Sequence, residues 1–206
     1  MSDEEVIRRV QRGDRRCFEE LHRRYYQKVW RFAKRSLVDP ELASDVASET
    51  FLRAFRSIDR FSVRRNATFA AWLFRIAANL MADLSRRAPR MPSVSLDEQG
   101  ELCERLADGQ PIPLDQILYQ EKLHRVREAV ERLPFSDRQI LCLSYEDRLS
   151  IKEIAVVMGK PSATAVTSHL HRALTKLRHL LLNDRYFVPE DGESHVEAMQ
   201  RDQRDS

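Results

Sequence analysis

Apolar residues recur at spacings of three and four along most of this 206-residue sequence, which is the period of an amphipathic α-helix. Three sets are expected to face the interior: Phe18, Leu21, Tyr25, Val29 and Phe32; Leu42, Val46, Phe51, Ala54, Phe55 and Ile58; and Phe69, Leu73, Ile76, Leu80 and Leu84. No stretch of useful length alternates as a β-strand would, and the five glycines are too few for a turn-rich sandwich. The sequence therefore predicts an all-α fold.

Capping residues mark where several of these helices begin. Asp14 is placed to cap the first long helix, and Asp39-Pro40-Glu41 combines a capping oxygen, a proline at the first helical position and an acid in the first turn. Ser136-Asp137-Arg138-Gln139 and Ser150-Ile151-Lys152-Glu153 both match the capping box. Gly159 is expected to end the helix that the second box opens.

The helical pattern is interrupted over residues 89–116, which divides the chain into two small helical domains. This stretch contains four prolines and an acidic middle, so a flexible linker is expected. We expect one domain over residues 1–88 and the other over residues 117–183. The polar and acidic residues 184–206 are expected to form a mobile tail.

Composition limits the classes of function. No apolar run approaches the roughly 18–20 residues of a membrane span, and the acidic N-terminus lacks a signal-peptide pattern, so a cytoplasmic location is expected. Cys17, Cys103 and Cys142 are too scattered for a disulfide framework or a zinc site, and no metal or cofactor is expected. Residues 1–90 carry 20 basic against 12 acidic side chains, which favours a polyanionic partner.

The most specific pattern lies between Ser150 and Leu177, where a short capped helix, a glycine-containing turn and a second apolar-periodic helix follow one another. This order is typical of a helix-turn-helix, in which the start of the second helix enters the major groove. The candidate DNA contacts are Thr164, Thr167, Ser168, His171, Arg172 and Lys176. An ordinary α-hairpin within a helical bundle is the structural alternative.

Three motifs follow the order found in bacterial extracytoplasmic-function sigma factors of RNA polymerase, and the sequence resembles that family over most of its length. Residues 45–55 (DVASETFLRAF) are similar to region 2.2, and residues 69–79 (FAAWLFRIAAN) to regions 2.3–2.4. Region 4 is resembled by Leu133-Pro134, QIL at 139–141, SIKEIA at 150–155 and VTSHLHRA at 166–173. The resemblance implies a subunit that directs promoter-specific transcription initiation and is not itself an enzyme.

For the N-terminal domain the resemblance implies a face that binds the β′ clamp helices of core polymerase. The residues assigned to it are Asp45, Ser48, Glu49 and Leu52, whose spacing places them on one side of a helix. Two neighbouring acids beside an outward leucine suit a docking face better than a solvated face. The alternative is a solvated face in which Glu49 pairs with Arg53.

The same resemblance assigns the capture of a flipped base of the minus-ten element to the next helix and the loop before it. The assigned residues are Phe61, Arg75, Asn79 and Arg86. The loop between Phe61 and Phe69 is about two residues longer than is usual in the family, so its base preference is open. Packing in the core is the alternative role for Phe61, and bonding to backbone groups for Asn79.

For the C-terminal domain the resemblance implies reading of the minus-thirty-five element and binding to the β flap of polymerase. It also implies an anti-sigma factor as a partner. Ser48 stands where the family usually has Gln, and Thr167 and His169 stand where basic residues are common. We therefore expect Arg172 to contribute more to minus-thirty-five binding than Thr167.

Two other functions are compatible with parts of the sequence. A stand-alone helix-turn-helix regulator that binds a palindrome as a dimer would explain the C-terminal pattern, but it leaves the N-terminal motifs unexplained. An enzyme with Cys142 as nucleophile and His169 or His171 as base lacks a third, orienting group.

Overall fold

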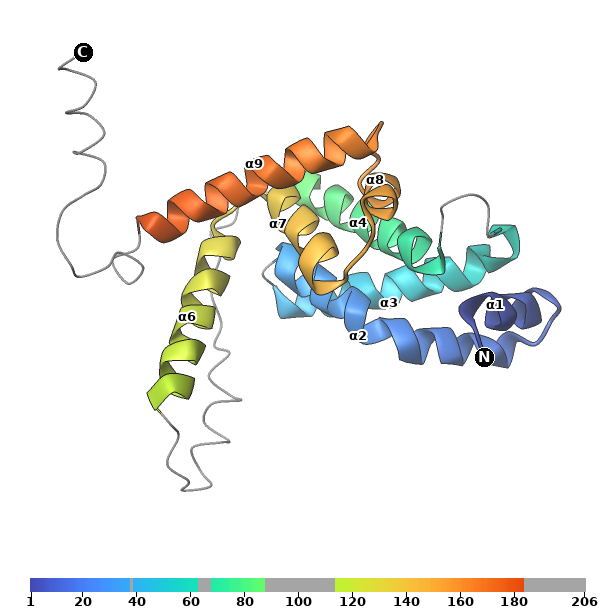
Figure 1. The fold of residues 1–206 in the computed structure, drawn as a ribbon. Helices are drawn as coiled ribbons and strands as arrows, with labels where there is room; N and C mark the ends of the chain where they lie inside the picture. The colour runs from blue at the N-terminus through green and yellow to red at the C-terminus, as the bar shows by residue number, and fades with distance from the viewer. Residues whose placement is uncertain (38, 63–67, 88–113, 184–206) are drawn as a thin grey trace, which may run out of the picture.

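The computed structural model of this chain describes residues 1–37, 39–62, 68–87 and 114–183, and within these ranges every regular element is a helix (Figure 1). The elements in chain order are α1 (Asp3–Gln11), η1 (Arg15–Cys17), α2 (Phe18–Leu37), α3 (Pro40–Ser57), η2 (Ile58–Arg60), α4 (Phe69–Arg87), α6 (Leu114–Glu131), α7 (Phe135–Leu141), η3 (Cys142–Glu146), α8 (Ile151–Val157) and α9 (Ala163–Leu182). The all-α prediction is confirmed. The predicted tail and most of the predicted linker lie outside the described residues, and α6 begins at Leu114, inside the expected linker.

Helices α1 to α4 form one unit around a shared apolar core. Of the three sets expected to face inward, every member except Leu42 is buried or packs, partly buried, against the core. Phe32 of α2 and Phe74 of α4 meet edge to face with ring centroids 5.2 Å apart, a favourable arrangement for two aromatic rings. The prediction for Leu42 is wrong: its side chain is 39% exposed, because Ala43, one position later, takes the inward place in the first turn of α3.

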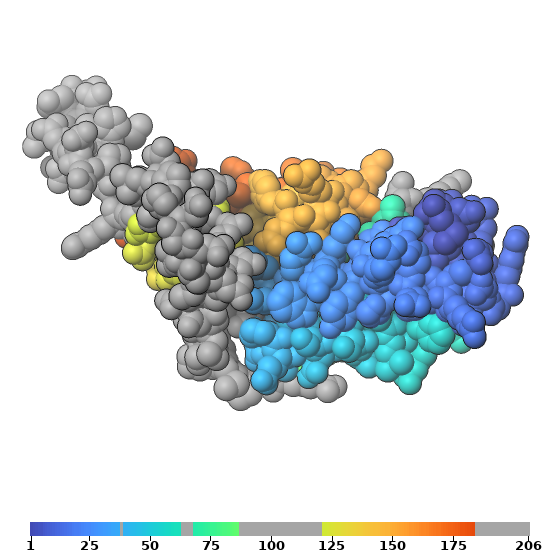
Figure 2. Space-filling model, turned by 90° about the horizontal axis from the view of Figure 1, so that it is seen from below, coloured from blue at the N-terminus to red at the C-terminus, as the bar shows by residue number. Residues whose placement is uncertain are grey.

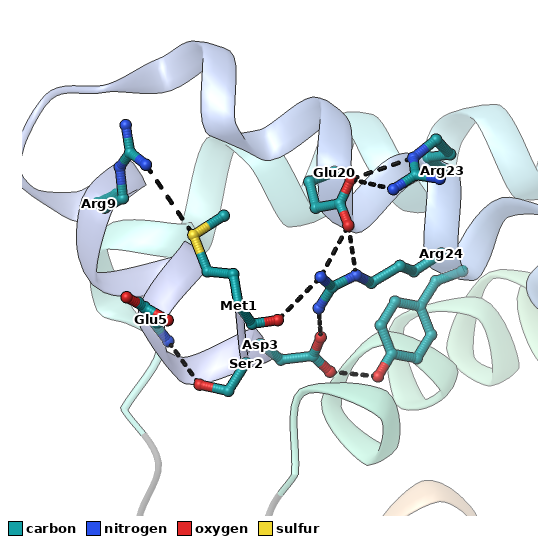
Figure 3. A network of polar contacts seen from close by, with 9 residues as sticks. Met1, Ser2, Asp3, Glu5, Arg9, Glu20, Arg23 and Arg24 are labelled. Carbon is teal, nitrogen blue, oxygen red and sulfur yellow. Dashed lines mark hydrogen bonds and ion pairs between the residues drawn. The ribbon is translucent and has the colours of Figure 1, made fainter.

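Hydrogen bonds and ion pairs between charged side chains hold helix α1 against α2 (Figure 3). Asp3 accepts a hydrogen bond from Arg24 Nη1 at 2.7 Å and another from the Tyr25 hydroxyl. Glu20 accepts bonds from both Arg23 and Arg24, so one carboxylate orders two guanidinium groups. At the other end of α1, the Gln11 side-chain amide donates to two backbone carbonyls around η2. Together these contacts make α1 an integral part of the first unit.

Helices α6 to α9 form the second unit. The residues predicted to begin and end α8 do so in the structure. Ser150 and Glu153 form the predicted capping box at the start of α8. Gly159 has a φ of +60°, the left-handed conformation that favours glycine, directly after α8 ends. Ser162 then caps α9, a helix of 20 residues.

Two predicted caps are wrong. The turn η1 separates Asp14 from α2, and the Asp14 carboxylate instead accepts hydrogen bonds from Arg9 and Cys17. Helix α7 starts at Phe135 after Pro134 and has no side-chain cap, because Ser136, the supposed cap, lies inside the first turn and Gln139 is buried. By contrast, Asp39 caps α3 as predicted, through bonds from two backbone amides in the first turn.

The two units pack against each other in this structure. In Figure 1, α7 lies over α2 and α8 lies over α4, and Figure 2 shows the orange surface of the second unit against the blue surface of α2. The guanidinium of Arg138 donates two hydrogen bonds to the Ser36 carbonyl in the last turn of α2, at 3.0 and 2.7 Å. Arg35 and Glu146 add an ion pair at 3.5 Å. A basic side chain at the end of α2 also complements the partial negative charge of that helix terminus.

Candidate nucleic-acid interface

Helices α8 and α9 form a helix-turn-helix held together by apolar side chains. Ile154 and Val157 of α8 are buried together with Val166 and Ala173 of α9. The outward side of α9 carries all the residues predicted to contact minus-thirty-five DNA, and each of them is exposed: Thr164, Thr167, Ser168, His171, Arg172 and Lys176. The geometry therefore brings the predicted DNA contacts together on one accessible face.

The hydroxyl and charged groups on this face are not all equally available. Thr167 Oγ1 donates to the Ala163 carbonyl of its own helix at 2.8 Å. Lys176 Nζ donates to Asp137 Oδ2 at 2.6 Å. His169 stands next to Ser168, where the family commonly has a basic residue, but the residue is only 5% exposed and its Nε2 lies 2.7 Å from Asp137 Oδ1. His169 therefore points into the second unit rather than to the exposed side of α9.

Helix α4 presents Arg75, Asn79 and Arg86 on its exposed side, as the sequence predicts. Arg86 forms an ion pair with Asp83. The Arg75 guanidinium donates to the Val156 carbonyl of α8 at 2.9 Å, so the first helix of the helix-turn-helix lies on the predicted minus-ten reader. The loop between α3 and α4, to which base selection was assigned, lies largely outside the described residues.

Phe61 lies in an aromatic cluster rather than on the surface. Its side chain is 8% exposed, and its ring centroid lies 5.8 Å from that of Phe69 and 4.8 Å from that of Trp72. Since a base could stack on Phe61 only after this cluster opened, the structure favours the packing role that the sequence left as the alternative.

The predicted docking face on α3 is exposed. Asp45, Ser48 and Leu52 are all exposed, and Leu52 retains 42% of its accessible surface. Glu49 is partly exposed and forms an ion pair with Arg53 at 2.7 Å. Leu42, the one apolar residue that the sequence pattern misplaced, lies on the same side of the helix, three residues before Asp45. Its spacing from Asp45 and Leu52 was the signal that could have assigned it to this face.

The surface of α3 is turned away from the second unit. In Figure 2 the cyan surface of α3 and the orange surface of the second unit lie on opposite sides of α2. The packing of the two units therefore covers part of α4 and leaves the docking face of α3 open.

Cys142, the candidate nucleophile of an enzyme, is buried. Cys142 is 3% exposed, and burial, with repulsion from Glu146, raises the pKa of its thiol to about 12. His169 is bonded to Asp137, and His171 lies on the exposed side of α9. Over the described part of the chain, no three His, Cys, Asp or Glu side chains gather as metal ligands. None of the described helices is both long and apolar enough to cross a membrane.

These features define the class of the protein: a two-unit helical protein with a helix-turn-helix. Comparison with known families narrows the class, since residues 21–91 match sigma-70 region 2 and residues 123–177 match sigma-70, region 4. The ECF RNA polymerase sigma factor SigW of Bacillus subtilis (strain 168) is 32% identical over 182 residues, covering 85% of this chain and 94% of that protein. The chain belongs to the sigma-70 family and is an extracytoplasmic-function sigma factor, a factor for transcription initiation.

Solved structures agree with this assignment. CnrH, solved in complex with the cytosolic domain of CnrY, is 27% identical with a TM-score of 0.64, and the match covers 88% of this chain and 98% of that chain. The sigma factor RpoE in complex with the anti-sigma factor NepR from Bartonella quintana shares the fold at 21% identity, with a TM-score of 0.57 and coverage of 82% and 98%. The alternative of a stand-alone helix-turn-helix regulator is not favoured, because both sigma regions match in order.

Proposed function

We propose that this sigma factor docks on core RNA polymerase through α3, reads the minus-ten element with α4 and reads the minus-thirty-five element with the start of α9. The observation that carries the proposal is the outward row on α3, which runs from Leu42 through Asp45, Ser48 and Glu49 to Leu52. Two exposed leucines flank the acids, over about 15 Å of helix at 1.5 Å per residue. Exposed leucines on one helix face beside acids suit a protein partner with an apolar and basic surface.

The DNA-reading part of the proposal assigns residues 1–88 to the minus-ten domain and residues 117–183 to the minus-thirty-five domain. Arg75, Asn79 and Arg86 would face minus-ten DNA, and Thr164, Thr167, Ser168, His171 and Arg172 would face minus-thirty-five DNA. Helix α8 must first move away from this part of α4, since the Arg75 guanidinium donates to the Val156 carbonyl of α8 and the two helices pack together there. Phe61 supports the shape of the minus-ten domain from its core.

We also propose that the chain performs no catalysis and that an anti-sigma factor is among its partners. The buried thiol of Cys142 supports the first point, because a thiol with a raised pKa is a weak nucleophile. The relatives CnrH and RpoE, both solved with bound partner proteins, support the second.

The docking face can be tested with Asp45→Arg/Glu49→Arg. We expect this variant to lose co-purification with core polymerase while its helical content and melting temperature stay close to those of the wild type. The matched control is Glu4→Arg/Glu19→Arg, which makes the same change of charge at two exposed acids of α1 and α2. Assembly and promoter-specific transcription by the Asp45/Glu49 variant at wild-type levels would refute the assignment.

A further inference from the structure

One buried carboxylate connects α7 to the helix that carries the predicted minus-thirty-five contacts. The side chain of Asp137 is 3% exposed, and each of its oxygens has its own partner on α9. Oδ1 lies 2.7 Å from His169 Nε2, and Oδ2 accepts from Lys176 Nζ at 2.6 Å. The two partners are seven residues apart, which is almost two turns of helix, or about 10 Å along its axis. A single carboxylate therefore fixes both the rotation of α9 and its position along that axis.

The charge state of Asp137 follows from these contacts. Burial on its own raises the pKa of a carboxyl, but the hydrogen bonds from Lys176 and His169 outweigh it, and the pKa of Asp137 lies below its ordinary value. The group is therefore an ionised carboxylate inside the second unit. Such a charge needs a compensating cation, and Lys176 supplies it.

His169 has no second anchor among the described residues. Its other ring nitrogen, Nδ1, is buried and has no hydrogen-bond partner there. The orientation of the ring therefore depends on Asp137. Val166, His169 and Ala173 are all buried along one side of α9, so rotating His169 outward would rotate the exposed side of the helix as well.

Lys176 differs from Arg172, another cation on α9, because its ammonium group is paired with the Asp137 carboxylate. Its side chain is 52% exposed and lies four residues after Arg172, on the same side of the helix, so it has access to the proposed DNA face. Its ammonium is nevertheless held at 2.6 Å by an ionised carboxylate. Arg172 is exposed and bears its charge on the same face without such a partner among the described side chains. A DNA phosphate would have to compete with Asp137 for Lys176 but not for Arg172.

Building on the proposed function, we propose that Asp137 is a positioning residue for minus-thirty-five recognition that sets α9 through His169 and withholds Lys176 from promoter phosphates. Lys176, which the sequence pattern assigned to DNA, is then a structural cation. Removing the charge of Asp137 should release Lys176 and add one phosphate contact. Damage to the fold alone would weaken binding without adding a contact, so the two effects have opposite signs.

The test measures how the affinity of holoenzyme depends on salt, with a promoter fragment that the wild-type holoenzyme selects from a randomised library. Each phosphate contact contributes about 0.9 to the slope of log K against log salt concentration. Asp137→Asn keeps an oxygen that can accept from His169 and removes the charge. We expect its slope to steepen by about 0.9, so that affinity falls about 3.5-fold more than in the wild type between 50 and 200 mM salt.

Lys176→Met provides the decisive comparison, with Lys122→Met, an exposed lysine of α6, as the matched control. We expect Lys176→Met to keep the wild-type slope, and the double variant Asp137→Asn/Lys176→Met to return to it. A slope that becomes shallower by about 0.9 in Lys176→Met overturns the inference, as does an unchanged slope in a folded Asp137→Asn protein. If Asp137→Asn does not fold, Lys176→Met decides alone. A wild-type protein that captures no polymerase would refute the proposed function before any variant is compared.

Discussion

Arg138 bonds across the contact between the two units, and its replacement by Met tests how much that side chain contributes to stability. The guanidinium donates four hydrogen bonds: two to Ser36 O, one to Glu131 O at 2.9 Å and one to Leu133 O at 2.6 Å. Met keeps the apolar stem and removes every donor. Hydrogen bonds to a charged group contribute about 1.5–3 kcal/mol each, whereas burial of the guanidinium, which lowers its pKa, opposes them.

The net loss of unfolding free energy in Arg138→Met is expected to be about 3 kcal/mol, since three carbonyls lose a charged donor and one buried charge is relieved. For a chain of this size, each kcal/mol corresponds to about 2–4 °C, so the melting temperature should fall by about 6–12 °C. Thermal unfolding followed by far-UV circular dichroism measures the change. Arg132→Met, at an exposed arginine in the turn between α6 and α7, is the control and should melt close to the wild type. A melting temperature of Arg138→Met within about 2 °C of the wild type would refute the reasoning.

Three further predictions concern single side chains. Arg172→Ala should weaken holoenzyme binding to a selected promoter by more than Thr167→Ala, because the Thr167 hydroxyl is bonded to its own helix; the reverse order in a gel-shift titration would contradict this. Burial raises the pKa of Asp147 to about 7. The carboxyl is then protonated in the folded protein at pH values where the same carboxyl in the unfolded chain is ionised. The free energy of unfolding therefore falls as the pH rises from about 4 to 7. Urea titrations should show Asp147→Asn gaining stability over the wild type between pH 5 and 8, and a difference that does not vary with pH would count against the assignment. Ser150→Ala should cost about 1 kcal/mol through loss of the capping box, whereas Ser136→Ala, at a serine that caps nothing, should be nearly neutral; equal effects would show that capping is not the cause.

Periodicity predicted the core because burial in a helical protein repeats with the helix. It failed at Leu42 since a first-turn residue at the edge of the apolar side can face either way, and Ala43 fills the inward place. His169 could have been placed correctly from the sequence. It follows Val166 by three residues and precedes Ala173 by four, which is the spacing of an inward residue, but its polar character favoured the surface.

The sequence predicted which side of each single helix in the candidate site is exposed, but not the contacts between helices. The exposed sides of α3, α4 and α9 follow from local spacing, and the structure exposes the predicted residues there, with the exceptions of Phe61, which is buried, and Glu49, which is partly exposed. The pairings that modify the site join residues far apart in sequence. Asp137 meets His169 across 32 positions, and Arg138 meets Ser36 across 102. No local pattern specifies such contacts, because they depend on how whole helices pack.

Arg138 also contributes to the equilibrium between packed and separated arrangements of the two units. If the two Arg138–Ser36 bonds and the other contacts between the units together favour the packed arrangement by about 3 kcal/mol, separated units make up less than about 1% of the population, because each 1.4 kcal/mol is a factor of ten. A ligand that binds only separated units then has an apparent affinity about 100-fold weaker than its intrinsic affinity. Conversely, a ligand that bridges the packed units gains from the same preference. Arg138, whose hydrogen bonds go to Ser36, Glu131 and Leu133, would then influence how tightly a ligand that spans both units binds.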